Sequence, residues 1–409
     1  MMDEQPKSTV QEDIERLFLL PEGQRVLSCI QCGTCAGTCP HGEYMDYTPR
    51  KIIAMLRAGQ VDEVINSKSM LKCLSCYACQ LKCPRGIKLT DVLLPIIKGK
   101  VFESIVEMPP ELQRSFENTL RYGNPMGESP KKRAEWTKNS KVPVRILKEN
   151  PAPVDVLWIV ECYPSYHPRG IDVTLATART FHRLGIDFAI LGEEERCIGD
   201  CAGYFGEFGL QEALIDYSLN IFRKYKFNRI VTSGSHAFNT FQRWYPRYDF
   251  NIPVHHAMPF IATYIDRLKP FLKKPLNYTV TYHDPCCLGR CVGVSLPECF
   301  YHQPRILLSS IPGIKVVEMV HHRENSICCG GGGGGMWLDT YFKAEGMERL
   351  SERVVKEAVA AGADVLAVSC DYEISRFEDA VKVLGLEEKI KVRDIMELID
   401  ESAGGDETL

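Results

Sequence analysis

The chain has 409 residues, of which 45% are hydrophobic and 25% charged, and this composition is typical of a soluble globular protein with two or three domains. A net charge of −4 without a basic stripe argues against nucleic acid as a partner. The polar, acidic start does not resemble a secretory signal, and no apolar run reaches the roughly 18 residues that span a bilayer. The 18 cysteines therefore predict metal ligands in a reducing cytoplasm rather than disulfides.

The first 28 residues predict a leader with one amphipathic helix, at roughly 10–20. Two cysteine runs with the spacing C-x₂-C-x₂-C-x₃-C-P follow: Cys29, Cys32, Cys35 and Cys39, then Cys73, Cys76, Cys79 and Cys83. This spacing is typical of [4Fe–4S] clusters, and in two-cluster proteins the fourth cysteine of each run ligates the other cluster. We predict one cluster on Cys29, Cys32, Cys35 and Cys83, and a second on Cys73, Cys76, Cys79 and Cys39. Disulfides or zinc are the alternatives, and the repeated spacing disfavours both.

The segment between the two runs has helical periodicity. Its apolar residues Ile52, Ile53 and Leu56, then Val61 and Val64, recur at helical intervals after a Thr-Pro pair that suits a helix start. A further helix is expected at about 91–102. Residues 1–102 are thus predicted to form an α-helical ferredoxin domain with two [4Fe–4S] clusters, because a small β-sheet ferredoxin has a shorter spacer.

The next segment, 103–152, is rich in Pro and Gly, and we interpret it as a linker between domains. It contains the basic residues Lys131, Lys132 and Arg133. These are expected to form a solvated patch; a docking patch for an acidic partner is the alternative.

From residue 153 onward, short apolar runs alternate with helical stretches. The runs are expected to be strands, at 154–160, 227–233, 276–283 and 363–369. This alternation predicts an α/β fold with mostly parallel strands, in which functional sites form beyond the carboxyl ends of the strands.

A weak internal repeat divides this region in two. Cys162 and Cys286 each follow a strand, residues 195–200 correspond to 326–331, and 231–241 correspond to 368–377. We predict a duplicated domain with halves at 153–275 and 276–400, followed by a polar tail at 401–409.

The motifs HDPCC (283–287), CCGGGGGG (328–335) and SCDYE (369–373) resemble the CCG domain of the heterodisulfide reductase family. The two N-terminal cysteine runs look like the ferredoxin subunit of that enzyme. The chain from about 25 to 400 therefore resembles the D-type subunit, in which these two parts are fused. The iron–sulfur subunits of glycolate oxidase and anaerobic glycerol-3-phosphate dehydrogenase are similar in plan.

This resemblance implies a third [4Fe–4S] cluster in the second half, either noncubane or an ordinary cube. Its ligands would be Cys286, Cys328, Cys329 and Cys370. Glu373 replaces the last cysteine of the family pattern, so that its carboxylate and the thiol of Cys287 are further candidate ligands.

The first half departs further from the pattern. Cys162 and Cys197 are present and Cys201 lies off the pattern, but Ile198, Gly234 and Ala237 stand where cysteines are expected. Too few thiolates remain for a four-iron cluster, so this half is expected to be a structural partner that closes the cleft over the second site.

The glycine run 330–335 is expected to let the backbone pass close to a bulky cluster and to offer amides to its sulfurs, rather than to bind a nucleotide. His283 is either a structural residue that bonds a loop carbonyl, which we favour, or a proton donor to a departing thiolate. His236 could line the same cleft. The pairs 255–256 and 321–322 are interpreted as surface or loop histidines, and the aromatic residues at 238–245 as helix core.

The predicted function is that of an iron–sulfur electron-transfer subunit that passes single electrons to the second-half site, where a disulfide is reduced. The resemblance implies the heterodisulfide of coenzymes M and B as substrate. No dinucleotide fingerprint is found, so a flavoprotein, ferredoxin or membrane cytochrome subunit would donate electrons. The alternative is a non-catalytic relay in a flavin-dependent dehydrogenase or electron-bifurcating complex acting on a hydroxy acid, an acyl-CoA or a quinone. A cytoplasmic hetero-oligomer is expected, free or held at the inner face of the membrane by a partner.

Overall fold

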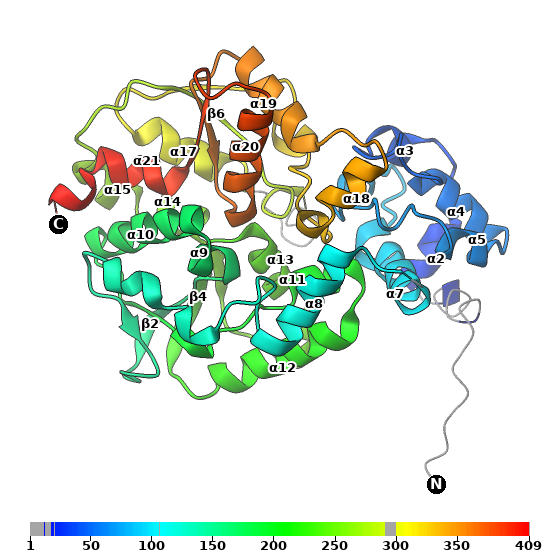
Figure 1. Ribbon diagram of the computed structural model, residues 1–409, viewed down its shortest axis with the longest axis horizontal. Helices are drawn as coiled ribbons and strands as arrows, with labels where there is room; N and C mark the ends of the chain where they lie inside the picture. The colour runs from blue at the N-terminus through cyan, green and yellow to red at the C-terminus, as the bar shows by residue number, and fades with distance from the viewer. Residues whose placement is uncertain (1–11, 13–17, 20, 106, 291–299, 409) are drawn as a thin grey trace, which may run out of the picture.

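The computed structural model describes residues 12, 18–19, 21–105, 107–290 and 300–408. Figure 1 shows three parts: a small N-terminal part in blue beside two larger parts, one green and one yellow to red. Among the described residues, no helix has the length and apolar character needed to cross a membrane. Most of the helix predicted at 10–20 lies outside the described residues.

Every element between residues 21 and 104 is helical in the described part of the chain. The helices are α2 (Pro21–Leu27), α3 (Thr34–Gly37), α4 (Pro49–Arg57), α5 (Val61–Ile65), α6 (Ala78–Leu81), the π-turn η1 (Leu89–Leu93) and α7 (Leu94–Ser104). Extended Thr48 precedes Pro49, whose fixed φ suits the first helical position. The apolar faces of α4 and α5 share one core with the cysteine loops.

Residues 103–152 differ from the predicted linker, because they fold onto the first sheet. Helix α8 (Pro110–Tyr122) ends at Gly123, which has a φ of +72°, and the short helices η2 (Pro130–Lys132) and η3 (Glu135–Asn139) follow. Trp136 is buried against Trp158 with a ring separation of 5.7 Å, and β1 (Arg145–Ile146) pairs with the sheet. The Pro and Gly residues begin and end helices here instead of separating domains.

The first half contains a parallel five-stranded sheet of order β1-β3-β2-β4-β5. Its strands after β1 are β2 (Val154–Ile159), β3 (Phe188–Ile190), β4 (Phe227–Thr232) and β5 (Val254–His256). Its helices are α9 (Cys162–Tyr166), α10 (Pro168–Arg183), α11 (Asp200–Phe205), α12 (Phe208–Phe222), α13 (Ser235–Arg243), α14 (Ala257–Ala262) and α15 (Ile265–Leu268), with 3₁₀ turns η4 (Gly192–Glu194), η5 (Tyr245–Tyr248) and η6 (Lys269–Phe271).

The second half repeats this design with a parallel four-stranded sheet of order β7-β6-β8-β9. Its strands are β6 (Thr279–Tyr282), β7 (Lys315–Val317), β8 (Val365–Val368) and β9 (Lys391–Asp394). Its described helices are α17 (His302–Ser310), α18 (Asp339–Ala344), α19 (Leu350–Ala360), α20 (Asp371–Val383) and α21 (Ile395–Ser402), with 3₁₀ turns η7 (Arg323–Asn325), η8 (Gly335–Trp337) and η9 (Gly405–Thr408). The predicted parallel α/β architecture is confirmed.

The two halves pack against each other through helices. Helix α10 contacts α21 (Figure 1). A single hydrophobic core runs from the first sheet to the second. Buried Asp400 accepts hydrogen bonds from Arg179 and Arg183 across this contact. Helices α13 and α20 meet at a second place between the halves, where the ring of His236 lies 5.3 Å from that of Tyr372.

Candidate functional site

The eight N-terminal cysteines form two crossed groups. Cys35 lies beside Cys29, Cys32 and Cys83, whereas Cys39 lies beside Cys73 and Cys76, and Cys79 beside Cys73, Cys76 and Cys39. Burial and the neighbouring thiols raise the pKa of Cys35 to about 11. A thiol that is hard to ionise alone and surrounded by other thiols is well placed for a cation that would hold it as thiolate.

Both cysteine loops contain the same arrangement of left-handed backbone conformations. In the first loop, Gln31 and Gly33 flank Cys32 with φ values of +58° and +86°. In the second loop, Ser75 and Tyr77 flank Cys76 with φ values of +52° and +63°. These left-handed positions turn the loop so that successive thiols converge.

The predicted cysteines of the second half also converge. Cys286 and Cys287 follow β6, Cys328 and Cys329 lie in the loop after β7, and Cys370 caps α20 directly after β8. Each is at most 6% exposed. Cys328 lies beside Cys286, Cys329 and Cys76, so the ferredoxin part contributes a thiol to the edge of this site.

The glycine run explains this close approach. The amides of Gly330 and Gly331 lie 3.5 and 3.4 Å from the sulfurs of Cys328 and Cys329. A Cβ atom on Gly332 or Gly333 would come within 2.8 Å of the Leu74 backbone. Side chains at these positions would separate the ferredoxin loop from the second half, and the bare backbone allows the contact.

Two buried basic side chains stabilise the contact between the ferredoxin loop and the α/β domain. Nζ of Lys98 donates to the carbonyls of Cys73 (2.7 Å) and Tyr204 (3.1 Å), and Nε of Arg290 donates to the carbonyl of Cys76 (2.9 Å). Burial lowers the pKa of Lys98. The loop that carries Cys73 and Cys76 is thus held from both halves of the α/β domain.

His283 and Glu373 form a buried pair beside the cysteines. Nδ1 of His283 lies 2.9 Å from Oε1 of Glu373, and its Nε2 bonds the Ile327 carbonyl at 2.8 Å. The Glu373 carboxylate raises the pKa of His283 to about 9 despite burial, and burial raises that of Glu373 to about 7. The carbonyl bond is the structural role favoured for His283, and it positions the segment before Cys328.

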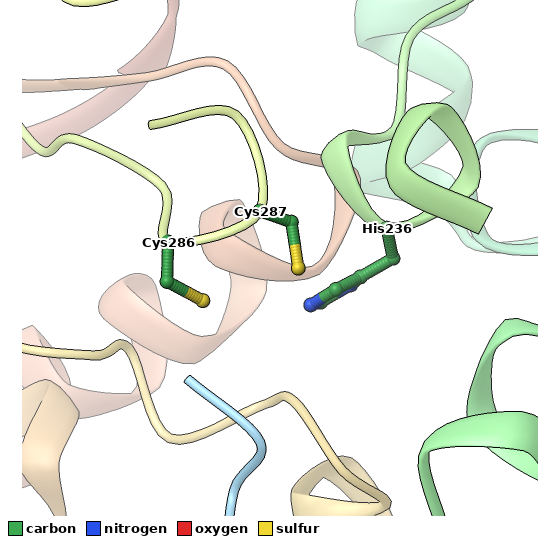
Figure 2. Close-up of side chains that lie close together, drawn as sticks. All are labelled: His236, Cys286 and Cys287. Atoms are coloured by element: carbon green, nitrogen blue, oxygen red, sulfur yellow. The ribbon is translucent and has the colours of Figure 1, made fainter. Parts of the chain in front are cut away.

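His236 reaches this site from the first half (Figure 2). One of its ring nitrogens and the sulfurs of Cys286 and Cys287 all lie within 4.8 Å of one another, and all three residues are buried. From the sequence, His236 could only be placed at the cleft. Its separation of about 50 residues from Cys286 carries no spacing signal for a shared site.

In the first half, protein side chains fill the equivalent position. Arg133 donates to Cys162 Sγ (3.2 Å) and to Glu195 (2.8 Å), and it is 2% exposed. Glu161 accepts from the Gly234 amide at 2.7 Å, and a Cβ on Gly234 would come within 2.1 Å of its carboxylate. A side chain at Gly234 therefore has no room while Glu161 keeps this position. The interpretation of Arg133 as solvated is wrong, although Lys131 and Lys132 are exposed.

The remaining thiols of the first half contact one residue of their own half and one of the other. Cys197 lies 3.5 Å from Asp200, and Cys201 lies 3.8 Å from the Tyr372 hydroxyl. His256 differs from the predicted surface histidine: it is fully buried, and its Nδ1 caps α14 by accepting from the Met258 amide. His321 is exposed as expected and pairs with Glu357.

A groove leads to the junction from outside. Its volume is about 680 Å³, and its lining includes Cys39, Cys76 and Cys328 together with Lys82, Arg290 and Arg353. This volume is in the range of small-molecule sites. A ligand in the groove would meet thiols of both the ferredoxin part and the second half.

Comparisons with known proteins agree with this division. A model of the 4Fe-4S dicluster domain matches residues 28–88, and a model of the cysteine-rich CCG domain matches 156–242 and 280–372. The D-type subunit of dihydromethanophenazine:CoB–CoM heterodisulfide reductase from Methanosarcina barkeri is 31% identical over 333 residues, which cover 79% of this chain and 75% of that protein. The chain belongs to the family of heterodisulfide reductase D-type subunits. The predicted iron–sulfur character and the duplicated CCG domain are confirmed.

Other members of this wider group have different names. "Probable iron-sulfur-binding oxidoreductase FadF" of Bacillus subtilis is 30% identical over 73% of this chain. "EtfAB:quinone oxidoreductase" of Syntrophomonas wolfei is 28% identical over 91% of it. The chain spans 42% and 57% of the length of these two proteins.

Proposed function

We propose that this member of the heterodisulfide reductase D-type family is an electron-transfer subunit with three [4Fe–4S] sites in series. The contact between Cys76 and Cys328 carries the proposal, because it joins the ferredoxin part to the second CCG site without intervening chain. When bound, the clusters carry single electrons, and thiolates are their preferred ligands.

The donor sets fit this assignment. Cys29, Cys32, Cys35 and Cys83 would hold one cluster, and Cys73, Cys76, Cys79 and Cys39 a second, in a ferredoxin domain of the α-helical type at 1–102. The third would be held by Cys286, Cys328, Cys329 and Cys370. The contact of Cys370 Sγ with Asp371 is long, at 3.7 Å, so it leaves this thiol free to bind a metal.

We further propose that the second CCG site reduces a disulfide bound in the groove of about 680 Å³. A disulfide takes up two electrons and two protons and gives two thiols. The groove is lined by three cations, Lys82, Arg290 and Arg353, and by two carboxylates, Glu43 and Glu324. This balance leaves a small positive excess, which suits an anionic disulfide. The heterodisulfide of coenzymes M and B belongs to this class, and the M. barkeri relative bears its name.

The experiment supplies reduced viologen to anaerobically purified protein and measures viologen oxidation with a series of anionic and neutral disulfides. Turnover with anionic disulfides is expected, with a higher KM in Lys82→Gln. Lys343→Gln, on the exposed surface of α18, is the control and should leave the KM unchanged. An absence of turnover with every disulfide, alone and with partner subunits, would exclude the reductase.

The second candidate is a relay without its own substrate. The name of the EtfAB:quinone oxidoreductase of Syntrophomonas wolfei favours it, since that name contains a quinone and no step at a disulfide is needed for a relay. The partner would then be a flavoprotein or a quinone-reactive subunit, in a hetero-oligomer in the cytoplasm or at the inner face of the membrane. Reduction of all three clusters by an electron-transferring flavoprotein, without disulfide turnover, would support this role.

A further inference from the structure

We propose that His236, supplied by the first CCG half, is a nitrogen ligand of the metal centre in the second CCG site, together with Cys286 and Cys287. This inference rests on the proposed third cluster and names a ligand for it. The family pattern has a further cysteine ligand where this chain has Glu373. Oε1 of Glu373 lies 2.9 Å from Nδ1 of His283, so this carboxylate is already paired and another ligand is needed.

The first argument is proximity. A ring nitrogen of His236 and the sulfurs of Cys286 and Cys287 lie within 4.8 Å of one another, and Figure 2 shows the ring directed at the two thiols. A metal ion between such donors needs bonds of about 2.0–2.3 Å, so donors on opposite sides of it lie about 4 Å apart. Imidazole is a suitable ligand for iron, and it replaces thiolate on one iron of some iron–sulfur centres.

The second argument is that the ring is buried and fixed against the two thiols. His236 is 5% exposed and lies between Tyr372 and Tyr204, with ring separations of 5.3 and 6.1 Å. Its polar contacts include the thiols of Cys286 and Cys287. An imidazole fixed beside two thiols needs little rearrangement to bind a metal together with them.

The third argument is the reciprocity of the two halves. His236 and Tyr372 are both the second residue of a helix, α13 and α20, that follows an inner strand of its sheet, β4 and β8. Tyr372 crosses to the first half, where its hydroxyl lies 3.8 Å from Cys201 Sγ. His236 crosses in the opposite direction. The duplicated fold thus places one side chain of each half in the cysteine site of the other, and only the second half retains enough thiols to hold a cluster.

The test is pulsed electron paramagnetic resonance on protein labelled with ¹⁵N only in histidine, in the redox state in which the third cluster is paramagnetic. We expect a strong ¹⁵N hyperfine coupling that is lost in His236→Gln and retained in His256→Gln, a matched change at another buried histidine. His236→Cys should keep the iron content of the wild type and lose the coupling, because a thiolate replaces the imidazole. The spectra of the two ferredoxin clusters report in each variant that the chain is folded.

The outcomes separate this inference from the proposed function. A third cluster without strong histidine coupling, or with coupling that survives in His236→Gln, would overturn the inference and leave the electron-transfer assignment intact. About eight iron atoms per chain, as expected for the ferredoxin pair alone, would overturn the third cluster and the inference with it.

Discussion

Nδ1 of His283 lies 2.9 Å from Oε1 of Glu373, and both side chains are 1% exposed. In the family pattern, the position of Glu373 carries a cysteine. The substitution therefore exchanges a thiol for a carboxylate that holds a histidine, which in turn bonds the Ile327 carbonyl beside Cys328. Glu373 acts on the loop that carries Cys328 through this pair.

Glu373→Ala is expected to destabilise the fold by about 3–5 kcal/mol, because it leaves a buried partner of a charge pair uncompensated. Glu373→Gln keeps a hydrogen-bond acceptor for His283 and should retain the full iron content. Anaerobic thermal unfolding and iron analysis of both variants check this. A loss of iron in Glu373→Gln would instead make the carboxylate a ligand.

The junction between the ferredoxin loop and the glycine run gives a second prediction. Gly333→Ala places a Cβ 2.8 Å from the Leu74 carbonyl carbon at a φ of +56°, whereas Gly346→Ala, at +69°, meets nothing within 4 Å. The backbone conformation costs both variants about 1–2 kcal/mol, and overpacking adds about 1–3 kcal/mol to Gly333→Ala alone. We expect Gly333→Ala to slow reduction of the third cluster in stopped-flow experiments. Equal rates in the two variants would show that this contact is not needed for electron transfer.

The two CCG halves should respond differently to loss of a cysteine. Cys329→Ala is expected to remove the third cluster, about four of about 12 iron atoms. Cys197→Ala should keep every iron atom, because the first half is filled by Arg133, Glu195 and Glu161. Iron and sulfide analysis with absorption spectra distinguishes the two. Iron loss in Cys197→Ala would contradict a metal-free first half.

His256 gives a prediction for pH. Burial lowers its pKa to about 3, whereas the unfolded chain has an ordinary value near 6.5. Below pH 6.5 His256 is protonated in the unfolded state but stays neutral in the folded state. The free energy of unfolding should therefore fall by up to about 1.4 kcal/mol per pH unit as pH decreases towards 3. His256→Gln should lessen this slope. Unfolding midpoints between pH 7 and 5 measure it, and identical slopes would show that His256 is charged in the fold.

The sequence predicts the features that depend on local spacing. The two cysteine runs, the helical spacer and the strands before Cys162 and Cys286 are recognisable because period and turn residues are local properties. Strands β3, β5 and β7 are not predicted from the sequence, because each has only three residues and shows no alternation of apolar and polar positions. Helix α8 is not predicted because its flanking Pro and Gly residues resemble those of a linker.

The site itself depends more on contacts between distant segments. Arg133 looks like its neighbours Lys131 and Lys132, and only the packing of the 103–152 segment against Cys162 and Glu195 distinguishes it. His236 lies in the repeat segment 231–241, which has lost the cysteines of its pattern at Gly234 and Ala237. Its place beside Cys286 follows from how the two halves pack, which periodicity within one segment does not report.

The central claim is that a third iron–sulfur cluster completes an electron path from Cys76 to the second CCG half. The most direct measurement is iron and acid-labile sulfide per chain in anaerobically isolated protein, combined with a redox titration followed by electron paramagnetic resonance. We predict about 12 iron atoms and three separate paramagnetic centres. About eight iron atoms and two centres would contradict the account.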